Sequence, residues 1–301
     1  MKVLVLGSSG FLGSYLGFAL TKMGHDVSGV SRSPVAYFPG NIVLEGLDDY
    51  TEMIRSGDYP VVINCVAVSS HEACENDPES AEAVNATFPA VWASAAAHSG
   101  SRFVHISTDA VFDGLEIEPY IETDVTAPQS VYGKTKVEGE KSVIAANPDA
   151  LVLRANFFGW SRSRRSGILD FFVNAFTYHT PITGFQDYVV SSLYMGDLLE
   201  AMMELLERGA SGVFHTVSST PLSKYEFGLI VADSAGLSAD SMAVGSLADA
   251  TDLAPRGHNL SLSTAKVEEV LGWPMPTSAA GVQRALAERD ALMDYFGANK
   301  E

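Results

Sequence analysis

The chain has 301 residues, of which 47% are hydrophobic and 19% are charged, a balance typical of a folded globular protein. Its formal net charge of −18 at pH 7 argues against nucleic acid or an anionic membrane surface as a partner, because both would repel an acidic protein. No apolar run approaches the roughly 18 residues that a membrane span needs. The short apolar start, MKVLVLG, runs into a glycine motif without the cleavage site of a signal peptide. We therefore expect a cytoplasmic protein.

The cysteines and histidines give no sign of a metal centre. Cys65 lies in an apolar run and Cys74 in a polar segment, which favours two free thiols in a reducing compartment over a disulfide or a metal pair. None of the seven histidines has the short spacing to another histidine or to a cysteine that a metal site requires. The histidines, His105 among them, are expected to be structural or to lie on the surface.

The first half of the chain alternates short apolar runs with longer amphipathic stretches. The runs are mostly continuous, which is typical of strands in a parallel sheet that is covered on both faces. The predicted strands are Lys2–Gly7, His25–Ser31, Asn41–Glu45, Pro60–Ala67, Arg102–Ser107 and Ala150–Arg154. The predicted helices are Phe11–Met23, Asp48–Ser56, Pro78–His98 and Gln129–Ala146. Repeated strand–helix units of this kind predict an α/β fold with a doubly wound parallel (Rossmann) sheet.

A glycine-rich loop follows the first predicted strand and opens a helix. Glycines at these positions allow a tight turn, close approach of the backbone to a pyrophosphate and close packing of helix on strand. The helix N-terminus offers free N–H groups to the phosphates. A structural turn is the alternative, but the position directly after an N-terminal strand favours dinucleotide binding. The predicted cofactor-binding residues of the loop are Gly7, Ser9, Gly10, Phe11, Leu12 and Gly13.

The end of the second predicted strand indicates which dinucleotide binds. NAD-binding proteins carry an acidic residue there, which binds the ribose 2′-hydroxyl. This chain has Ser31 and Arg32 and no carboxylate, and a guanidinium suits a phosphate. We therefore predict NADPH, with NADH as the alternative and a solvated loop arginine as the simpler reading.

Two segments carry residues suited to carbonyl reduction. Ser107, Thr108 and Asp109 end a predicted strand, and ligands of open parallel sheets bind beyond such strand ends. Tyr132 and Lys136 are four residues apart, so a helix places them on one face. A lysine ammonium, aided by oxidised nicotinamide, lowers the pKa of a tyrosine from about 10 and makes it a usable general acid. Tyr-x-x-x-Lys alone occurs often by chance, but here it follows the glycine loop and the Ser-Thr segment in order.

The regular pattern stops after Arg154. Met195–Glu207, Ser223–Gly236 and Ser263–Leu271 are predicted helices, and GVFHTVSS (212–219) is a predicted strand. We expect a dinucleotide-binding domain over residues 1–155 and a smaller, mixed α/β substrate-binding domain over residues 156–301. Residues 212–218 are an alternative addition to the main sheet.

Four stretches of the sequence resemble the dTDP-4-dehydrorhamnose reductase (RmlD-like) family of extended short-chain dehydrogenases/reductases. They are HISTDAVFDG (105–114), ETDVTAPQSVYGKTKVEGEK (122–141), NDPESAEAVNATFPA (76–90) and PRGHNLSLSTAKVEEVLGW (255–273). The resemblance covers nearly the whole chain. It implies an NAD(P)H-dependent oxidoreductase that reduces a keto group on a nucleotide-activated sugar.

The resemblance also implies roles for single residues. Thr108 would hydrogen-bond the substrate carbonyl, Tyr132 would donate the proton, and Lys136 would orient the nicotinamide ribose and tune Tyr132. Ser107 would contact the cofactor. Ala67 and Val68 would line the cofactor site, and the sugar would contact Asp109, Ala110, Asn156 and Phe157.

The chain departs from the family pattern where the sugar would bind. Ala110 stands in place of a tyrosine and Phe157 in place of a tryptophan; a further departure, before the last predicted helix, is Gly257 in place of a proline. The sequence therefore does not identify which sugar the protein binds. An epimerase with tightly held NAD and a non-catalytic NADP-binding regulatory subunit are the alternative functions, whereas a dehydratase is disfavoured because Ala110 occupies the position of its acidic residue.

Two further features have a functional and a structural interpretation. Arg162, Arg164 and Arg165 would grip a substrate diphosphate in bidentate fashion, or they form a solvated basic loop; Arg256 is a weaker candidate for the same role. The helices over 78–98 and 129–146 would form a homodimer interface, or pack within one chain.

Overall fold

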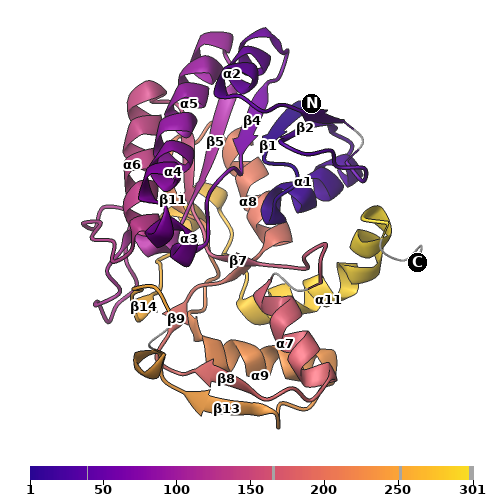
Figure 1. Ribbon diagram of the computed structural model, residues 1–301, viewed down its shortest axis with the longest axis vertical. Coiled ribbons are helices and arrows are strands. Elements are labelled where there is room, and N and C mark those ends of the chain that lie inside the picture. The colour runs from indigo at the N-terminus through magenta and orange to yellow at the C-terminus, as the bar shows by residue number, and fades with distance from the viewer. Residues whose placement is uncertain (39, 165–166, 251–252, 298–301) are drawn as a thin grey trace. The chain divides into compact units, whose positions relative to one another are not determined.

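The computed structural model describes residues 1–38, 40–164, 167–250 and 253–297 (Figure 1). The chain divides into two compact units. Unit 1 comprises residues 1–111, 130–154 and 206–214, and unit 2 comprises residues 112–129, 155–205 and 215–301.

Unit 1 is built on a sheet that, among the described residues, has seven strands in the order β11-β6-β5-β4-β1-β2-β3. All pairs from β6 to β3 are parallel. This arrangement confirms the predicted α/β fold with a doubly wound parallel sheet. The strands are β1 Lys2–Leu6, β2 Asp26–Ser31, β3 Asn41–Val43, β4 Val61–Asn64, β5 Arg102–Ser107, β6 Leu151–Arg154 and β11 Gly212–His215.

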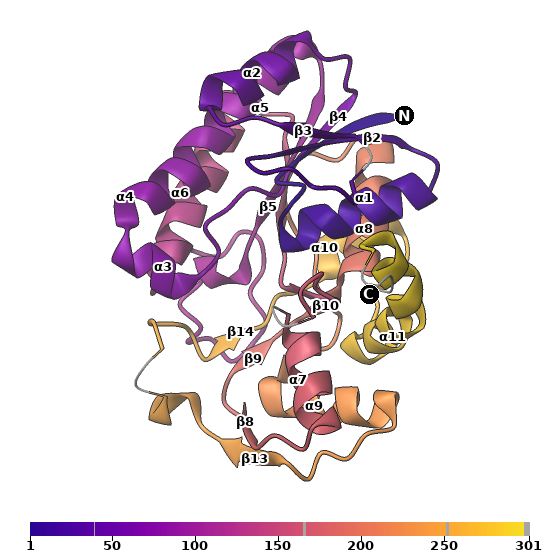
Figure 2. The same ribbon diagram turned by 45° about the vertical axis from the view of Figure 1, so that its right-hand side comes forward.

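The strands are apolar throughout because helices cover both faces of the sheet. Leu4 and Leu6 of β1 belong to a buried cluster with residues of α2, α5 and α6. Val3 and Val5 alternate with them, face the other side and are also fully buried. Figures 1 and 2 show α1 on the face opposite to α2, α5 and α6. These helices are α1 Phe11–Lys22, α2 Leu47–Ser56, α5 Phe88–Ser99 and α6 Val131–Ala146.

The helix predicted over 78–98 is interrupted in the structure. It consists of α4 (Pro78–Glu82), a π-helical turn over Ala83–Thr87, and α5. The turn carries the carbonyl of Asn85 to Gly139 of α6, where a Cβ atom would lie only 2.2 Å from that oxygen. Such π turns occur often at functional sites. A short helix, α3 (His71–Asn76), precedes it and was not predicted.

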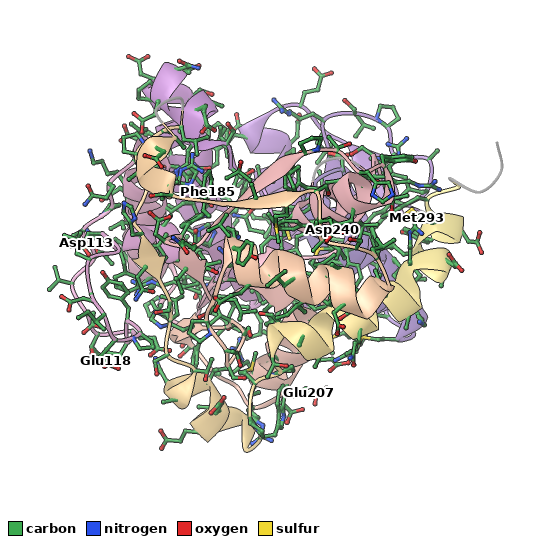
Figure 3. The ribbon with its side chains drawn as sticks, turned by 90° about the horizontal axis from the view of Figure 1, so that it is seen from below. Asp113, Glu118, Phe185, Glu207, Asp240 and Met293 are labelled. Atoms are coloured by element: carbon green, nitrogen blue, oxygen red, sulfur yellow. The ribbon has the colours of Figure 1, made fainter. Side chains whose placement is uncertain are left out.

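The segment 112–129 belongs to unit 2, whereas the predicted boundary placed it in the first domain. Backbone pairing explains the difference, because Tyr120 forms a parallel bridge with Leu262. The amide of Tyr120 donates to Ser261, and the amide of Ser263 donates to Tyr120. Asp113 and Glu118, both labelled in Figure 3, lie in this segment.

Unit 2 consists, in its described part, of small sheets of two or three short strands and five helices. The strands are β7 Phe157–Phe158, β8 Ile182–Phe185, β9 Val189–Val190, β10 Leu193–Tyr194, β12 Leu222–Ser223, β13 Met242–Gly245 and β14 Asn259–Leu260. The helices are α7 Ile168–Thr177, α8 Met195–Glu207, α9 Lys224–Ala235, α10 Ala265–Leu271 and α11 Ser278–Tyr295. Of the predicted strand over 212–219, only Gly212–His215 is a strand, and it joins the large sheet beside β6.

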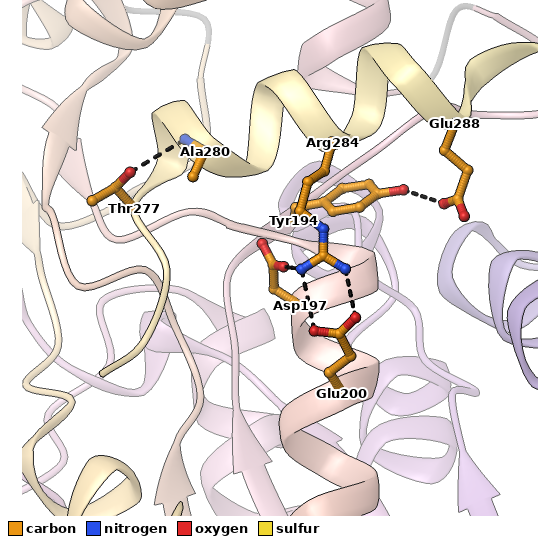
Figure 4. Close-up of polar contacts among 7 residues, drawn as sticks. All are labelled: Tyr194, Asp197, Glu200, Thr277, Ala280, Arg284 and Glu288. Carbon is orange, nitrogen blue, oxygen red and sulfur yellow. Dashed lines mark hydrogen bonds and ion pairs between the residues drawn. The ribbon is translucent and has the colours of Figure 1, made fainter. Parts of the chain in front are cut away.

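An ionic network links α8 to α11 within unit 2 (Figure 4). Arg284 of α11 donates to Asp197. It also makes two hydrogen bonds to Glu200, at 2.6 Å and 3.2 Å. Burial raises the pKa of Asp197 to about 6, even though the neighbouring Arg284 lowers it. The side chain of Asp197 has no exposed surface, so its charged form depends on the guanidinium of Arg284 for stabilisation.

Among the helices of the described residues, none has the length and apolar character needed to cross a membrane. A cluster of three or more histidine, cysteine or carboxylate side chains suited to a metal ion is also absent from the described part of the chain. Cys65 and Cys74 are both free thiols.

Candidate active site

The glycine loop has the geometry of a phosphate-binding turn. Gly7 has a φ of +86°, which side chains rarely tolerate, and a Cβ atom on Gly13 would lie 2.2 Å from the carbonyl oxygen of Gly7. Gly10 forms the N-cap of α1 without a side-chain hydrogen bond to the first turn. A helix N-terminus without a side-chain cap is a typical position for an anion such as a phosphate.

A cavity of about 430 Å³ opens beside this loop in unit 1. It is lined by seven of the predicted cofactor residues, which are Gly7, Ser9, Gly10, Ser31, Arg32, Ala67 and Val68. Phe11, Leu12 and Gly13 form the first turn of α1 instead. The exposed Arg32 places a guanidinium at the cavity together with Tyr50. A glycine cradle, an uncapped helix end and an arginine fit a dinucleotide that carries a 2′-phosphate.

Thr108 and Tyr132 meet at the carboxyl end of β5. The hydroxyl of Thr108 donates to Oδ1 of Asp109 at 3.0 Å, and the Thr108 side chain beside the phenol lowers the pKa of Tyr132. Burial acts more strongly and raises that pKa above its ordinary value, as do Asp109 and Cys74. The phenol of Tyr132 therefore keeps its proton at neutral pH in the free chain. The predicted lowering of this pKa concerns the chain with bound nicotinamide and stays a prediction.

Lys136 lies one helical turn after Tyr132 and is 1% exposed. Its Nζ donates to the carbonyl of Ile106 at 2.7 Å and lies 3.2 Å from Nε2 of His105. Burial lowers the pKa of Lys136 to about 8, while Glu140 and Cys65 raise it. Both hydrogen-bond contacts of Nζ within the described chain are thus made to β5.

A buried ion pair ties together the elements that carry these residues. Arg154 of β6 donates to Glu140 of α6 at 2.7 Å, and the side chains are 6% and 5% exposed. Ser107 of β5 donates its hydroxyl to the same carboxylate at 2.5 Å. The hydroxyl of Ser107, predicted to contact the cofactor, is therefore engaged inside the protein. The pair fixes β5, β6 and α6, and with them Thr108, Tyr132 and Lys136.

Sequence reasoning missed several residues around Tyr132. The ring of His71 lies 4.8 Å from the ring of Tyr132, centroid to centroid. Cys74 donates its thiol to the carbonyl of Val68 at 3.3 Å. Asn85, fully buried, accepts from the amide of Val68 at 2.9 Å and donates to Thr135 at 3.0 Å. A single amide in an apolar helical run was the signal for Asn85.

The predicted substrate residues belong to both units. Asp109 and Ala110 are buried in a 3₁₀ turn of unit 1, directly after Thr108. The others that are described belong to unit 2, where Asn156 accepts from Ser192 at 2.6 Å. These are Asn156, Phe157 of β7, the exposed Arg162, and Arg256, whose Nε donates to Ala254 at 3.1 Å. Arg165 lies outside the described residues.

Known proteins resemble this chain over nearly its full length. A family model for the RmlD substrate binding domain matches residues 1–291. The probable low-salt glycan biosynthesis reductase Agl14 of Haloferax volcanii is 32% identical over 283 residues, which cover 92% of this chain and 94% of that protein. A dTDP-4-dehydrorhamnose reductase of Mycobacterium tuberculosis is 33% identical over 271 residues, which cover 87% of this chain and 85% of that protein.

Solved structures agree with these relatives. A crystal structure of a dTDP-4-dehydrorhamnose reductase from Clostridium acetobutylicum has a TM-score of 0.84 and 25% identity, and the match covers 96% of this chain and 100% of that one. The resemblance predicted from the motifs is thereby confirmed. The chain belongs to the dTDP-4-dehydrorhamnose reductase family of extended short-chain dehydrogenases/reductases.

Proposed function

We propose that this chain is a reductase that uses NADPH to reduce a keto group on a nucleotide-activated sugar. The observation that carries the proposal is the placement of the Tyr132 phenol beside the Thr108 side chain at the carboxyl end of β5, with Lys136 one helical turn away. Membership of a family whose relatives include dTDP-4-dehydrorhamnose reductases supports the substrate class.

The chemistry of the three residues follows from what carbonyl reduction requires. When bound, NADPH supplies the hydride. Negative charge then develops on the carbonyl oxygen, where it needs a hydrogen-bond donor and a proton. Thr108, whose hydroxyl donates to Asp109 in the free chain, turns that donor to the carbonyl oxygen when the sugar binds, and Tyr132 delivers the proton that burial keeps on its phenol. Lys136, in its charged form, stabilises the phenolate that remains.

Replacing the acid tests the reaction. Tyr132→Phe should lower kcat about 100-fold or more, a typical effect of removing a general acid, and should leave the Kd for NADPH nearly unchanged. The assay follows NADPH oxidation with a dTDP-4-keto-6-deoxy sugar. Tyr178→Phe, at a tyrosine that is 75% exposed, is the matched control and should retain full activity. Full activity of Tyr132→Phe would refute the assignment.

The cofactor preference rests on Arg32 at the cavity beside the glycine loop. Arg32→Ala should weaken NADPH binding about tenfold through loss of a phosphate contact, with little change for NADH. Glu45→Gln changes an acidic residue that lines the same cavity and should not weaken NADPH. Equal loss of both cofactors in Arg32→Ala would reject the role of this arginine.

The epimerase alternative predicts a different balance of cofactor. A reductase oxidises one NADPH for each sugar, whereas an epimerase regenerates its nicotinamide and consumes none. Steady oxidation of added NADPH with a keto sugar nucleotide therefore separates the two functions. Absence of turnover with NADPH still bound would favour a regulatory subunit.

A further inference from the structure

A buried polar chain in unit 1 links β4, β5 and α6. His105 is 0% exposed and lies directly opposite Asn64 in the parallel register of β4 and β5. Its Nδ1 is 3.1 Å from Nδ2 of Asn64, and its Nε2 is 3.2 Å from Nζ of Lys136. The imidazole of His105 thus bridges the side-chain amide of Asn64 and the amine of Lys136, which has a role in the proposed reaction.

The amide of Asn64 can face His105 in only one way. Its Oδ1 accepts a hydrogen bond from the backbone N–H of Val66 at 3.0 Å. The amino group, Nδ2, is therefore turned toward His105, and an amino group only donates. Nδ1 of His105 must accept.

The proton of the ring then lies on the side of Lys136. Burial lowers the pKa of His105 well below its usual value, and a charged Lys136 would lower it further, so the ring is neutral and carries one N–H. With Nδ1 accepting, that N–H is on Nε2 and points at Nζ. An ammonium has three donors and no acceptor, whereas a neutral amine has a lone pair. All hydrogen bonds among Asn64, His105 and Lys136 are satisfied only when Lys136 is neutral.

The charged form of Lys136 disrupts this arrangement. An ammonium that donates to Nε2 requires the ring proton on Nδ1, where it meets the amino group of Asn64. Turning the amide over would relieve that contact, but it would withdraw the acceptor from Val66. Charging Lys136 therefore leaves a buried donor without an acceptor, which is unfavourable.

The other groups that face Lys136 have separate partners or weaker effects. Glu140, on the same helix, favours the ammonium but is already paired with Arg154. Cys65, which follows β4, favours the ammonium as well. Of these titratable groups, His105 is hydrogen-bonded to Nζ, and its other ring nitrogen is held by Asn64.

We propose that His105 is a positioning residue that, held by Asn64, presents its Nε2–H to Nζ and stabilises the neutral amine form of Lys136 in the free chain. The proposal rests on the proposed function, in which the ammonium of Lys136 assists Tyr132. When the pair takes up one proton, the proton of Nε2 moves to Nζ and the incoming proton is bound at Nδ1. No electrons are transferred. The charge of Lys136 and the tautomer of His105 therefore change together.

The tautomer can be measured on the free protein without any substrate. Chain labelled with ¹⁵N-histidine is expected to show His105 protonated on Nε2 in long-range proton–nitrogen spectra recorded above pH 8, where the pKa of about 8 leaves Lys136 mostly neutral. A ring protonated on Nδ1 would overturn the proposal. Because this readout does not involve turnover, it decides the proposal even if the proposed function fails.

A series at position 64 tests the coupling to the reaction. Asn64 donates to Nδ1, leucine would neither donate nor accept there, and aspartate would accept. Asn64→Asp should move the proton of His105 to Nδ1 and shift the alkaline limb of the kcat/KM profile upward by about one pH unit, the size expected for one hydrogen bond. Asn64→Leu should fall between it and the native chain.

The matched control is Asn147→Asp, which makes the same change at a buried asparagine 11 residues beyond Lys136 on the sequence. It should leave the alkaline limb unmoved. Loss of activity in Asn64→Asp with an unshifted pH profile and an unchanged tautomer would show a merely structural role and refute the proposal. Absence of turnover by the native chain would count against the proposed function alone.

Discussion

Each unit of this chain contains an ionic network, and the two networks differ in how fully their charged groups are hydrogen-bonded and shielded from water. In unit 1, Arg154 and Glu140 are almost fully buried, and Ser107 also donates a hydrogen bond to the carboxylate. In unit 2, Arg284 is 43% exposed, and Oδ2 of the buried Asp197 has no hydrogen-bond partner among the described residues. The complete network holds the candidate catalytic residues, whereas the incomplete one connects two helices. The more fully hydrogen-bonded network is thus the one that holds the candidate catalytic side chains, whose positions must be precise for the reaction.

The largest effect is expected from breaking the network of unit 1. Glu140→Gln leaves the guanidinium of Arg154 buried without a negative partner, which costs about 3 kcal/mol or more of unfolding free energy. Denaturant unfolding measures the loss. Glu138→Gln changes a carboxylate of the same helix that is 57% exposed and should cost less than about 0.5 kcal/mol. Equal effects of the two changes would contradict the comparison.

A smaller loss is expected in unit 2, because water reaches Arg284. Arg284→Gln leaves Asp197 as a buried carboxylate without its cation and should cost about 2 kcal/mol at neutral pH. The double variant Arg284→Gln with Asp197→Asn removes the uncompensated charge and should recover most of that loss. Failure of the double variant to recover would show that packing, and not charge, explains the effect.

The smallest effect is a dependence of stability on pH. The pKa of Asp197 rises from 3.8 to about 6 on folding, so the folded state binds this proton more tightly than the unfolded state. Its contribution to stability is therefore present at acid pH and is lost as pH rises from about 4 to about 6. We expect a loss of about 1 kcal/mol after screening at the half-exposed Arg284. The native chain should show this slope relative to Asp197→Asn; parallel pH curves would disprove it.

The sheet could be predicted from the sequence because its strands are continuous apolar runs separated by amphipathic helices. Thr108, Tyr132 and Lys136 were found for a related reason, since a strand end and a four-residue helical spacing are local signals. The helix α11 was missed: it buries small residues such as Gly281 and Ala285, which give little helical periodicity.

The partners of the catalytic candidates could not be predicted. Asn64 and His105 are 41 residues apart and meet only because β4 and β5 are neighbours in one particular register. Sequence reasoning placed His105 among structural or surface histidines, because nothing local marks its contact with Lys136. The π turn at Asn85 is likewise set by its packing against Gly139, not by a sequence signal.

The route of the chain between the units has a consequence for cutting the protein apart. The chain leaves unit 1 after Val111, three residues beyond Thr108, and re-enters it at Ser130, two residues before Tyr132. A fragment that ended at residue 155 would carry the stretch 112–129 without the strand partner of Tyr120, which is Leu262. This stretch, without its strand partner, would be the connection between Thr108 and Tyr132, which must face each other. Truncation of the chain, or circular permutation within unit 1 or unit 2, should therefore impair catalysis, even where the large sheet still folds.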